Sequence, residues 1–253
     1  MTKIKLLFVL WLGAVVLWGA PAYGGQELIV SAAASLTNAF PEIGKLFEKQ
    51  HPETKIIYNF AASGPLLQQI AQGAPVDVFA SADQKTMNQA VDKGLIVVAS
   101  RKDFVSNTLV LIAPEKSVLP LTALKDLAAP EIKRVALGNP ETVPVGRYTR
   151  EALTQAGLWE TFKPKFIYGE SVRQVLDYVG RGEVDAGFVF ATDAAIAKGK
   201  VKTMLAVKGH QPIVYPVAVV AASGKQALAQ SFVDFVLSPP AQEIFNKFGF
   251  GKP

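Results

Sequence analysis

Short apolar segments alternate along the chain with longer segments in which apolar and polar residues are mixed. The apolar segments are bounded by glycine, proline or small polar residues, as is typical of buried strands. The predicted strands span residues 27–30, 55–60, 76–80, 108–113, 135–137, 165–168, 186–190 and 214–221.

Between these strands, apolar residues recur at spacings of three and four, which predicts helices. The predicted helices span residues 35–50, 65–72, 83–92, 124–128, 147–156, 171–181, 225–237 and 240–248. Pro41 is expected to bend the first helix, because proline cannot donate a helix hydrogen bond. Pro65 is expected at the first position of the second helix. Strands that alternate with helices predict an α/β fold with mainly parallel sheets.

Two segments share one pattern. Residues 73–83 read GAPVDVFASAD, and residues 182–193 read GEVDAGFVFATD. Any strand-to-helix turn favours these residue types, so the similarity has two explanations. If it reflects the structure, it marks equivalent positions in two similar lobes. The strands at 108–113 and 214–221 are then the crossings between the lobes.

The start of the chain has the pattern of a secretory signal peptide. Lys3 and Lys5 precede an apolar run from Leu6 to Ala20, and small residues follow up to Gly24. The run is short for a membrane anchor, since a span needs about 20 apolar residues. We therefore predict that residues 1–24 are removed after Gly24 and that the mature chain is exported, with an uncleaved anchor as the alternative.

The net charge argues against a nucleic-acid partner. The whole chain has 26 basic and 21 acidic side chains, and without Lys3 and Lys5 the balance is 24 to 21, or +3. This excess is mild, and no dense basic run accompanies it. Cysteine is absent, so the exported chain has neither a disulfide nor a lipid-modified cysteine.

The sequence lacks the signatures of common catalytic and metal sites. Its two histidines, His51 and His210, have no partner at metal-ligand spacing. Nucleotide-binding loops and nucleophile elbows are also absent. Enzymes that act through carboxylates need no signature, so Asp77, Asp83 and Asp185 keep an exported enzyme open as an alternative.

Four strand-to-helix junctions are rich in small residues: 32–35 (AAAS), 61–64 (AASG), 143–146 (VPVG) and 169–172 (GESV). The first N–H groups of a helix are unpaired and carry partial positive charge, so small side chains there allow an anion to approach. Ser35 and Ser63 could add hydroxyl donors. For each junction taken singly, a serine that caps its own helix is the simpler explanation.

Seven stretches occur in order along the mature chain: AAASLTNAF (32–40), FAASGPLLQQIAQGAPVDVFASADQ (60–84), GNPETVPVGRYTREAL (138–153), GESVRQVLDYV (169–179), VFATDA (189–194), YPVAVV (215–220) and AQEIFNKFGF (241–250). Through them the chain resembles the molybdate-binding proteins of ABC transporters, which have the type II periplasmic binding protein fold. The resemblance implies two α/β lobes joined by a two-strand hinge. Lobe I would comprise residues 25–107 and 219–253, and lobe II residues 108–218.

The resemblance also implies the ligands of a dehydrated anion in the cleft between the lobes. Ser35 and Ser63 would donate through their hydroxyl and N–H groups, and Val145 and Val172 through their N–H groups. Phe190 stands where members of the family have a tyrosine that donates to the anion. The loss of that donor is expected to weaken binding by about 1.5–3 kcal/mol, or roughly ten- to a hundredfold, unless another group replaces it.

We therefore expect a periplasmic, monomeric binding protein, not an enzyme, that holds molybdate or tungstate and passes it to the membrane permease of an ABC transporter. No cofactor, nucleic acid or direct side-chain coordination of a metal is expected. A first alternative is the same fold with another anion, such as sulfate, phosphate or a carboxylate. A carboxylate or an amino acid would pair with Arg147 or Arg173, which the resemblance otherwise implies face the surface or brace the lobes. An exported enzyme that acts through carboxylates is a second alternative, and a regulatory sensor domain is a third. Asp83 and Asp193 are expected to cap helices.

Overall fold

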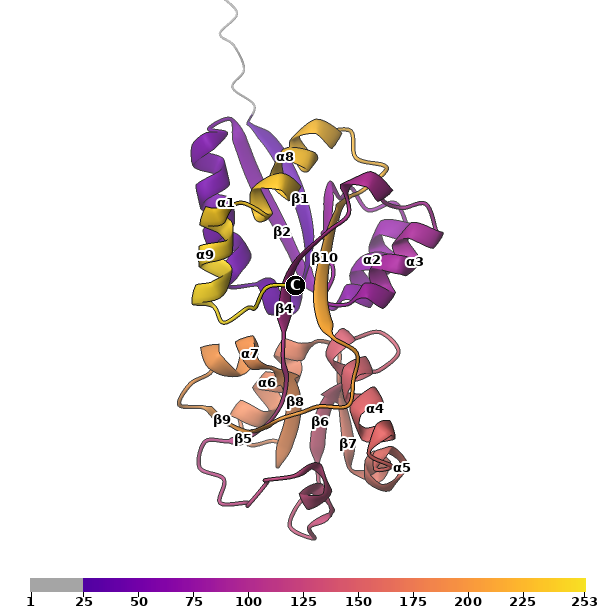
Figure 1. Cartoon of the computed structure of the whole chain (residues 1–253), viewed down its shortest axis with the longest axis vertical. Coiled ribbons are helices and arrows are strands. Elements are labelled where there is room, and N and C mark those ends of the chain that lie inside the picture. Colours follow the sequence, from indigo (N-terminus) through magenta and orange to yellow (C-terminus); the bar gives the residue numbers. More distant parts are fainter. Residues whose placement is uncertain (1–24) are drawn as a thin grey trace, which may run out of the picture.

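The structure is a computed structural model that describes residues 25–253, so the predicted signal peptide lies outside the described residues. Two lobes lie one above the other along the long axis of the molecule (Figure 1). Among residues 25–253, no helix is both long and apolar enough to cross a membrane.

The upper lobe in Figure 1 is built on a five-stranded sheet. The strands, in their order across the sheet, are β2 (Thr54–Ala61), β1 (Gln26–Ala33), β3 (Val78–Ala80), β10 (Ile213–Val219) and β4 (Lys102–Asn107). The strand β1 is parallel to β2 and β3, whereas β10 is antiparallel to both of its neighbours. The helices are α1 (Ala39–Gln50), α2 (Ser63–Ala71), α3 (Gln84–Asp92), α8 (Gln226–Val236) and α9 (Pro239–Lys247).

Each face of this sheet buries its own apolar cluster. On one face, the rings of Phe40, Phe104, Phe232 and Phe245 pack against one another beneath α1, α8 and α9. On the other face, residues of α2 and α3 enclose Phe79. Because helices cover both faces, the strands are fixed in place and their carboxyl ends can position a site.

The lower lobe is built on a second five-stranded sheet. Its strands, in order, are β7 (Phe166–Gly169), β6 (Val135–Gly138), β8 (Ala186–Phe190), β5 (Leu109–Pro114) and β9 (Val201–Ala206). Its helices are α4 (Pro144–Gln155), α5 (Trp159–Phe162), α6 (Val172–Gly180) and α7 (Ala191–Ile196). The strand β6 is parallel to β7 and β8, whereas β5 is antiparallel to β8 and β9.

The two segments that share a sequence pattern hold equivalent positions, which confirms the structural explanation of that pattern. The strands β3 and β8 are each third in their sheet, parallel to the second strand and antiparallel to the fourth. The aspartates before them also match. Asp77 accepts from the N–H of Ile29, and Asp185 accepts from the N–H groups of Lys133 and Arg134.

The chain crosses between the two sheets twice. The first crossing is at Thr108, between β4 and β5, next to the expected boundary at 107/108. The second lies in residues 207–212, between β9 and β10. The chain therefore rejoins the first sheet at Ile213, ahead of the expected boundary at 218/219, because residues 213–219 pair with β3 and β4.

Several helices begin where the sequence pattern did not place them. The predicted helix at 35–50 is two elements, a 3₁₀ turn (Ala34–Leu36) and α1, and Pro41 lies in the first turn of α1, where its missing N–H has no intrahelical acceptor to lose. The helix α2 begins at Ser63, so Pro65 is its third residue and not its first. Likewise α4 begins at Pro144, and Val145 therefore lies in its first turn.

Candidate anion-binding site

The five predicted site residues line one small cavity between the lobes. The space open to the centre of a water-sized sphere is about 10 Å³. If that space is roughly spherical, the walls lie ~2.7 Å from its centre, since a water-sized sphere has a radius of about 1.4 Å. The lining residues are Ala33, Ala34, Ser35, Ala62, Ser63, Ala82, Val143, Pro144, Val145, Val172 and Phe190. None of these side chains carries a charge.

The cavity lies where strands end and helices begin. In the first lobe, lining residues lie at the ends of β1 and β2, in the 3₁₀ turn after β1, and at the start of α2. In the second lobe, they lie at the end of β8 and at the starts of α4 and α6. Ligands of open α/β sheets bind at the carboxyl ends of the strands. Four alanines among the lining residues keep the backbone of the first lobe accessible from the cavity.

Four backbone N–H groups at this cavity have no acceptor among residues 25–253. They belong to Ser35, Ser63, Val145 and Val172, each of which lies in the first turn of its helix. In contrast, the neighbouring N–H of Gly64 donates to the carbonyl of Thr142 at 3.1 Å. Unpaired N–H groups at a buried surface cost free energy unless a ligand or water accepts from them, so these four call for an acceptor.

Both serine oxygens already have a hydrogen-bond partner in the first lobe. The oxygen of Ser63 accepts from the N–H of Ala82 at 3.0 Å, and that of Ser35 lies 2.9 Å from the hydroxyl of Tyr215. Neither hydroxyl caps its own helix, whereas Ser171 does cap α6 through the N–H of Gln174. The helix-capping explanation therefore fails for Ser35 and Ser63, and the hydroxyl proton of Ser63 has no acceptor among residues 25–253.

Phe190 closes the cavity with an apolar ring. Its side chain is buried, and its ring meets the rings of Tyr148 and Tyr215 at centroid distances of 6.4 and 5.9 Å. The ring of Phe190 is thus held between two tyrosine rings and brings no hydroxyl to the cavity. Burial raises the pKa of Tyr215 well above its usual value, so its hydroxyl stays neutral.

Direct contacts between the lobes flank the cavity. Arg147 of α4 donates from Nε to the carboxylate of Asp83 at 2.7 Å and from Nη2 to the hydroxyl of Thr86 at 2.7 Å. Arg173 of α6 donates to the carbonyl of Ser35 at 3.4 Å. Neither arginine lines the cavity. Both brace one lobe against the other, so the lobes are in a closed arrangement.

The two aspartates expected to cap helices differ. Asp83 caps α3 by accepting from the N–H of Thr86 at 3.0 Å. Asp193 lies inside the first turn of α7, fully buried, with Oδ1 2.6 Å from Nε of Arg173, although that N–H is not aimed at it. Burial raises the pKa of Asp193 to about 6, and the nearby arginine opposes that increase.

The carboxylates proposed for an enzyme have structural roles and lie apart. Asp77 accepts from Ser223 at 2.6 Å in addition to Ile29, and Asp185 ties the start of β8 to the strand beside it. Asp83 pairs with Arg147. Within residues 25–253, no cluster of three or more His, Cys, Asp or Glu side chains could hold a metal ion.

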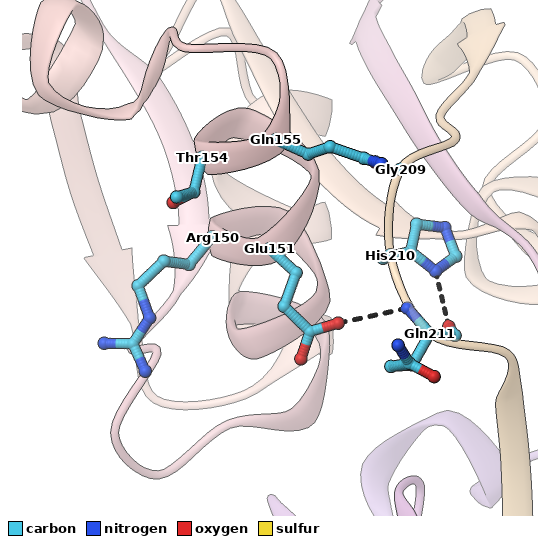
Figure 2. Close-up of a pocket in the computed structure, with 7 residues that line it drawn as sticks. All are labelled: Arg150, Glu151, Thr154, Gln155, Gly209, His210 and Gln211. Carbon is cyan, nitrogen blue, oxygen red and sulfur yellow. Dashed lines mark hydrogen bonds between the residues drawn. The ribbon is translucent and has the colours of Figure 1, made fainter.

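A wider hollow lies on the outer surface, away from the cavity. It measures about 870 Å³ and lies between α4 and the second crossing (Figure 2). There, Glu151 accepts from the N–H of Gln211 at 3.1 Å, and the ring of His210 contacts the carbonyls of Gln211 and Val207. The bond from Gln211 to Glu151 attaches the crossing segment to α4, whereas the contacts of His210 lie within that segment, and none of the predicted site residues lines this hollow.

Two lobes, a double crossing and a small cavity between them are features of solute-binding proteins. The chain belongs to the family of bacterial extracellular solute-binding proteins, which residues 28–251 match. It is 40% identical over 234 residues to the molybdate-binding protein ModA of Escherichia coli, covering 88% of each chain. It is 42% identical over 225 residues to YvgL of Bacillus subtilis, provisionally named a substrate-binding lipoprotein of an ABC transporter, covering 88% of this chain and 85% of that one.

The fold is that of the type II periplasmic binding proteins. The periplasmic molybdate-binding protein of Azotobacter vinelandii superposes with a TM-score of 0.77 at 26% identity, over 89% of this chain and 99% of that one. The prediction of fold and family from the sequence is thereby confirmed, whereas the anion contacts of Ser35, Ser63, Val145, Val172 and Phe190 stay a prediction.

Sequence reasoning missed three features around the cavity: the Tyr215 hydroxyl behind Ser35, the Ala82 N–H behind Ser63, and the pairing of Arg147 with Asp83 across the lobes. The YPVAVV stretch contained Tyr215, but nothing in its local pattern indicated which distant residue the ring would reach. Two of these three contacts, Ser35–Tyr215 and Arg147–Asp83, join residues more than 60 positions apart in the sequence.

Proposed function

We propose that this chain captures molybdate, or tungstate, in the periplasm and delivers it to the membrane permease of an ABC transporter. The observation that carries the proposal is the set of neutral donors at the cavity: two serine hydroxyls and four N–H groups that find no acceptor among residues 25–253. Donors of this kind at helix N-termini suit a compact anion. The relatives named as molybdate-binding proteins support the choice of anion.

The size of the cavity favours an inorganic oxyanion over an organic one. A space of about 10 Å³ for the centre of a water-sized sphere accommodates one compact ion. An amino acid or an organic carboxylate would keep the lobes apart and break the contact between Gly64 and Thr142. Such ligands also need a charged partner, and Arg147 and Arg173 are engaged elsewhere.

The donors also provide a basis for rejecting phosphate. Near neutral pH phosphate keeps a proton and needs an acceptor for it. The oxygen of Ser63 already accepts from Ala82, that of Ser35 is hydrogen-bonded to the hydroxyl of Tyr215, and no carboxylate lines the cavity. Sulfate has the charge and shape of molybdate, so its rejection rests on size: the longer metal–oxygen bonds of molybdate would reach all the donors at once.

Capture proceeds by closure of the lobes. The first lobe offers the hydroxyl and N–H groups of Ser35 and Ser63, and the second offers the N–H groups of Val145 and Val172, so neither lobe of an open form presents all six donors. The anion stabilises the closed form by the difference between its binding free energies to the closed and the open form. The permease would recognise the closed form, while nucleotide hydrolysis takes place on partner subunits. We further propose that residues 1–24 direct export and that the protein acts as a monomer without a cofactor.

Calorimetric titration of residues 25–253 with molybdate, tungstate, sulfate and phosphate at neutral pH tests the proposal. We expect saturable one-to-one binding of molybdate or tungstate and no binding of sulfate or phosphate. Binding of sulfate or phosphate in preference to both metal oxyanions would assign the same cavity to a different anion. Turnover of phosphate or sulfate esters would instead favour an enzyme.

A further inference from the structure

Asn107 lies at the first crossing between the lobes, with its side-chain amide held in one orientation. The amide oxygen accepts from the N–H of Thr108 at 2.9 Å, which places the NH₂ group on the other side. That group donates to the hydroxyl of Thr192 at 2.9 Å and to the hydroxyl of Tyr215 at 3.2 Å. All the hydrogen-bonding groups of this amide are thereby used, so its orientation follows from its partners.

The hydroxyl of Tyr215 consequently has one direction left for its proton. It accepts from Asn107, and the other polar atom within hydrogen-bond distance of it among residues 25–253 is the oxygen of Ser35, at 2.9 Å. The side chain of Tyr215 is fully buried, so a hydroxyl proton without an acceptor would cost free energy. Tyr215 must therefore donate to Ser35.

We propose that Asn107 and Tyr215 are positioning residues that orient the hydroxyl proton of Ser35 into the cavity. The proposal rests on the proposed function, because it assumes that an oxyanion accepts from Ser35. In this arrangement the hydrogen bonds run in one direction, from Asn107 to Tyr215 to Ser35 to the anion. Neutral hydrogen bonds in such a chain polarise one another and strengthen the last donor. The chain compensates in part for the hydroxyl that Phe190 lacks.

Ser63 provides a matched control within the same cavity. Its oxygen accepts from the backbone N–H of Ala82, which no side-chain substitution removes. Replacing Tyr215 by phenylalanine therefore leaves the hydroxyl of Ser35 free to rotate, while the hydroxyl of Ser63 keeps its orientation. A general packing role for Tyr215 would instead affect both serines.

The test is a pair of double-mutant cycles measured by molybdate titration. Tyr215→Phe is expected to weaken binding about tenfold, since one oriented hydrogen bond is lost. In the Ser35→Ala background, Tyr215→Phe should add less than about twofold, because the group that it orients is gone. In the Ser63→Ala background it should again weaken binding about tenfold. Thermal melting of each variant establishes that it folds.

Equal effects of Tyr215→Phe in the two serine backgrounds, or wild-type affinity of the single variant, would overturn the proposal. If Tyr215→Phe does not fold, Asn107→Ala removes the donor behind Tyr215, and the same two cycles apply with a smaller factor. Failure of the wild-type chain to bind any of the four oxyanions is a different result: it removes the proposed function and this inference with it.

Discussion

The two sides of the cavity contribute donors of different kinds. The first lobe presents two serines, each with a hydroxyl and an N–H, whereas the second presents the N–H groups of Val145 and Val172 and the apolar ring of Phe190. A survey of polar side chains would therefore find only half of this site. The other half consists of backbone N–H groups at the starts of α4 and α6. These groups contribute to binding only as far as the lobes approach each other.

The largest effect is expected from a substitution at the contact between the lobes. A Cβ atom on Gly64 would lie 2.4 Å from the carbonyl oxygen of Thr142, a backbone atom that cannot move aside cheaply. Gly64→Ala should keep the lobes apart and weaken molybdate binding at least about a hundredfold, because the donors of the second lobe are lost. Titration calorimetry measures the loss.

Gly224→Ala is the matched control for this substitution. A Cβ on Gly224 meets nothing within 4 Å, so this variant should bind as the wild type does. The melting temperature of ligand-free Gly64→Ala should stay near the wild-type value, since an open form has no clash. Wild-type affinity in Gly64→Ala would mean that binding does not require this closed arrangement.

The next largest effect is expected from serine substitutions in the first lobe, compared with a valine substitution in the second. Ser35→Ala and Ser63→Ala should each weaken binding by about 1.5–3 kcal/mol, roughly ten- to a hundredfold, as expected for a hydrogen bond to a charged ligand. Val172→Ala keeps its N–H and should change affinity less than about threefold. Titrations of the three variants measure these differences.

Melting curves separate binding from folding in this series. Ser63→Ala should also lower the melting temperature, because it leaves the buried N–H of Ala82 without an acceptor. Val172→Ala should lower it through lost packing while binding persists. A loss of affinity in Val172→Ala as large as in the serine variants would contradict the division between hydroxyl and backbone donors.

A smaller effect is expected from the ion pair across the lobes. Closure buries Asp83 and Arg147 together, with side-chain exposures of 5% and 7%. Arg147→Met leaves the carboxylate to be buried without its partner and should weaken binding about tenfold. The double variant Asp83→Asn/Arg147→Met removes both charges and keeps the helix cap, so its affinity should recover most of the loss. If the double variant binds no better than the single one, the pair does not act through closure.

Because of this ion pair, substitution of Arg147 does not show whether the ligand is an inorganic or an organic anion. From the sequence, a large loss in Arg147→Ala would indicate an organic anion held by the guanidinium group. In the structure Arg147 does not line the cavity, and the same loss follows from impaired closure. The distinction between inorganic and organic anions therefore rests on the ligand panel and not on this arginine.

Most of the fold was predictable because its strands are buried on both faces and read as continuous apolar runs. The strands β4 and β9 were missed for the opposite reason: they are edge strands in which Lys102, Asp103 and Lys202 interrupt the apolar pattern. A helix was expected to open at Asp193, but α7 already begins at Ala191, because it continues directly from β8 with no proline or glycine to mark its start.

The site was predictable only where local sequence determines it. Small residues at helix starts indicated the four junctions, and the resemblance to a family selected particular residues within them. The groups behind Ser35 come from β4 and β10, and no local pattern indicates that Asn107 and Tyr215 meet there. Tertiary contacts of this kind depend on the topology of the two sheets.

The smallest effect is expected on the apolar wall of the second lobe. Phe190→Tyr would restore a hydroxyl to a ring that already lines the cavity between Tyr148 and Tyr215. We expect molybdate binding to tighten up to about tenfold, because a donor to a charged ligand is gained while the new hydroxyl loses its access to water. Phe190→Leu changes the same wall without adding a donor and should not tighten binding. Unchanged or weaker binding in Phe190→Tyr would mean that the hydroxyl cannot reach the anion from this ring, and that the second lobe acts through its backbone alone.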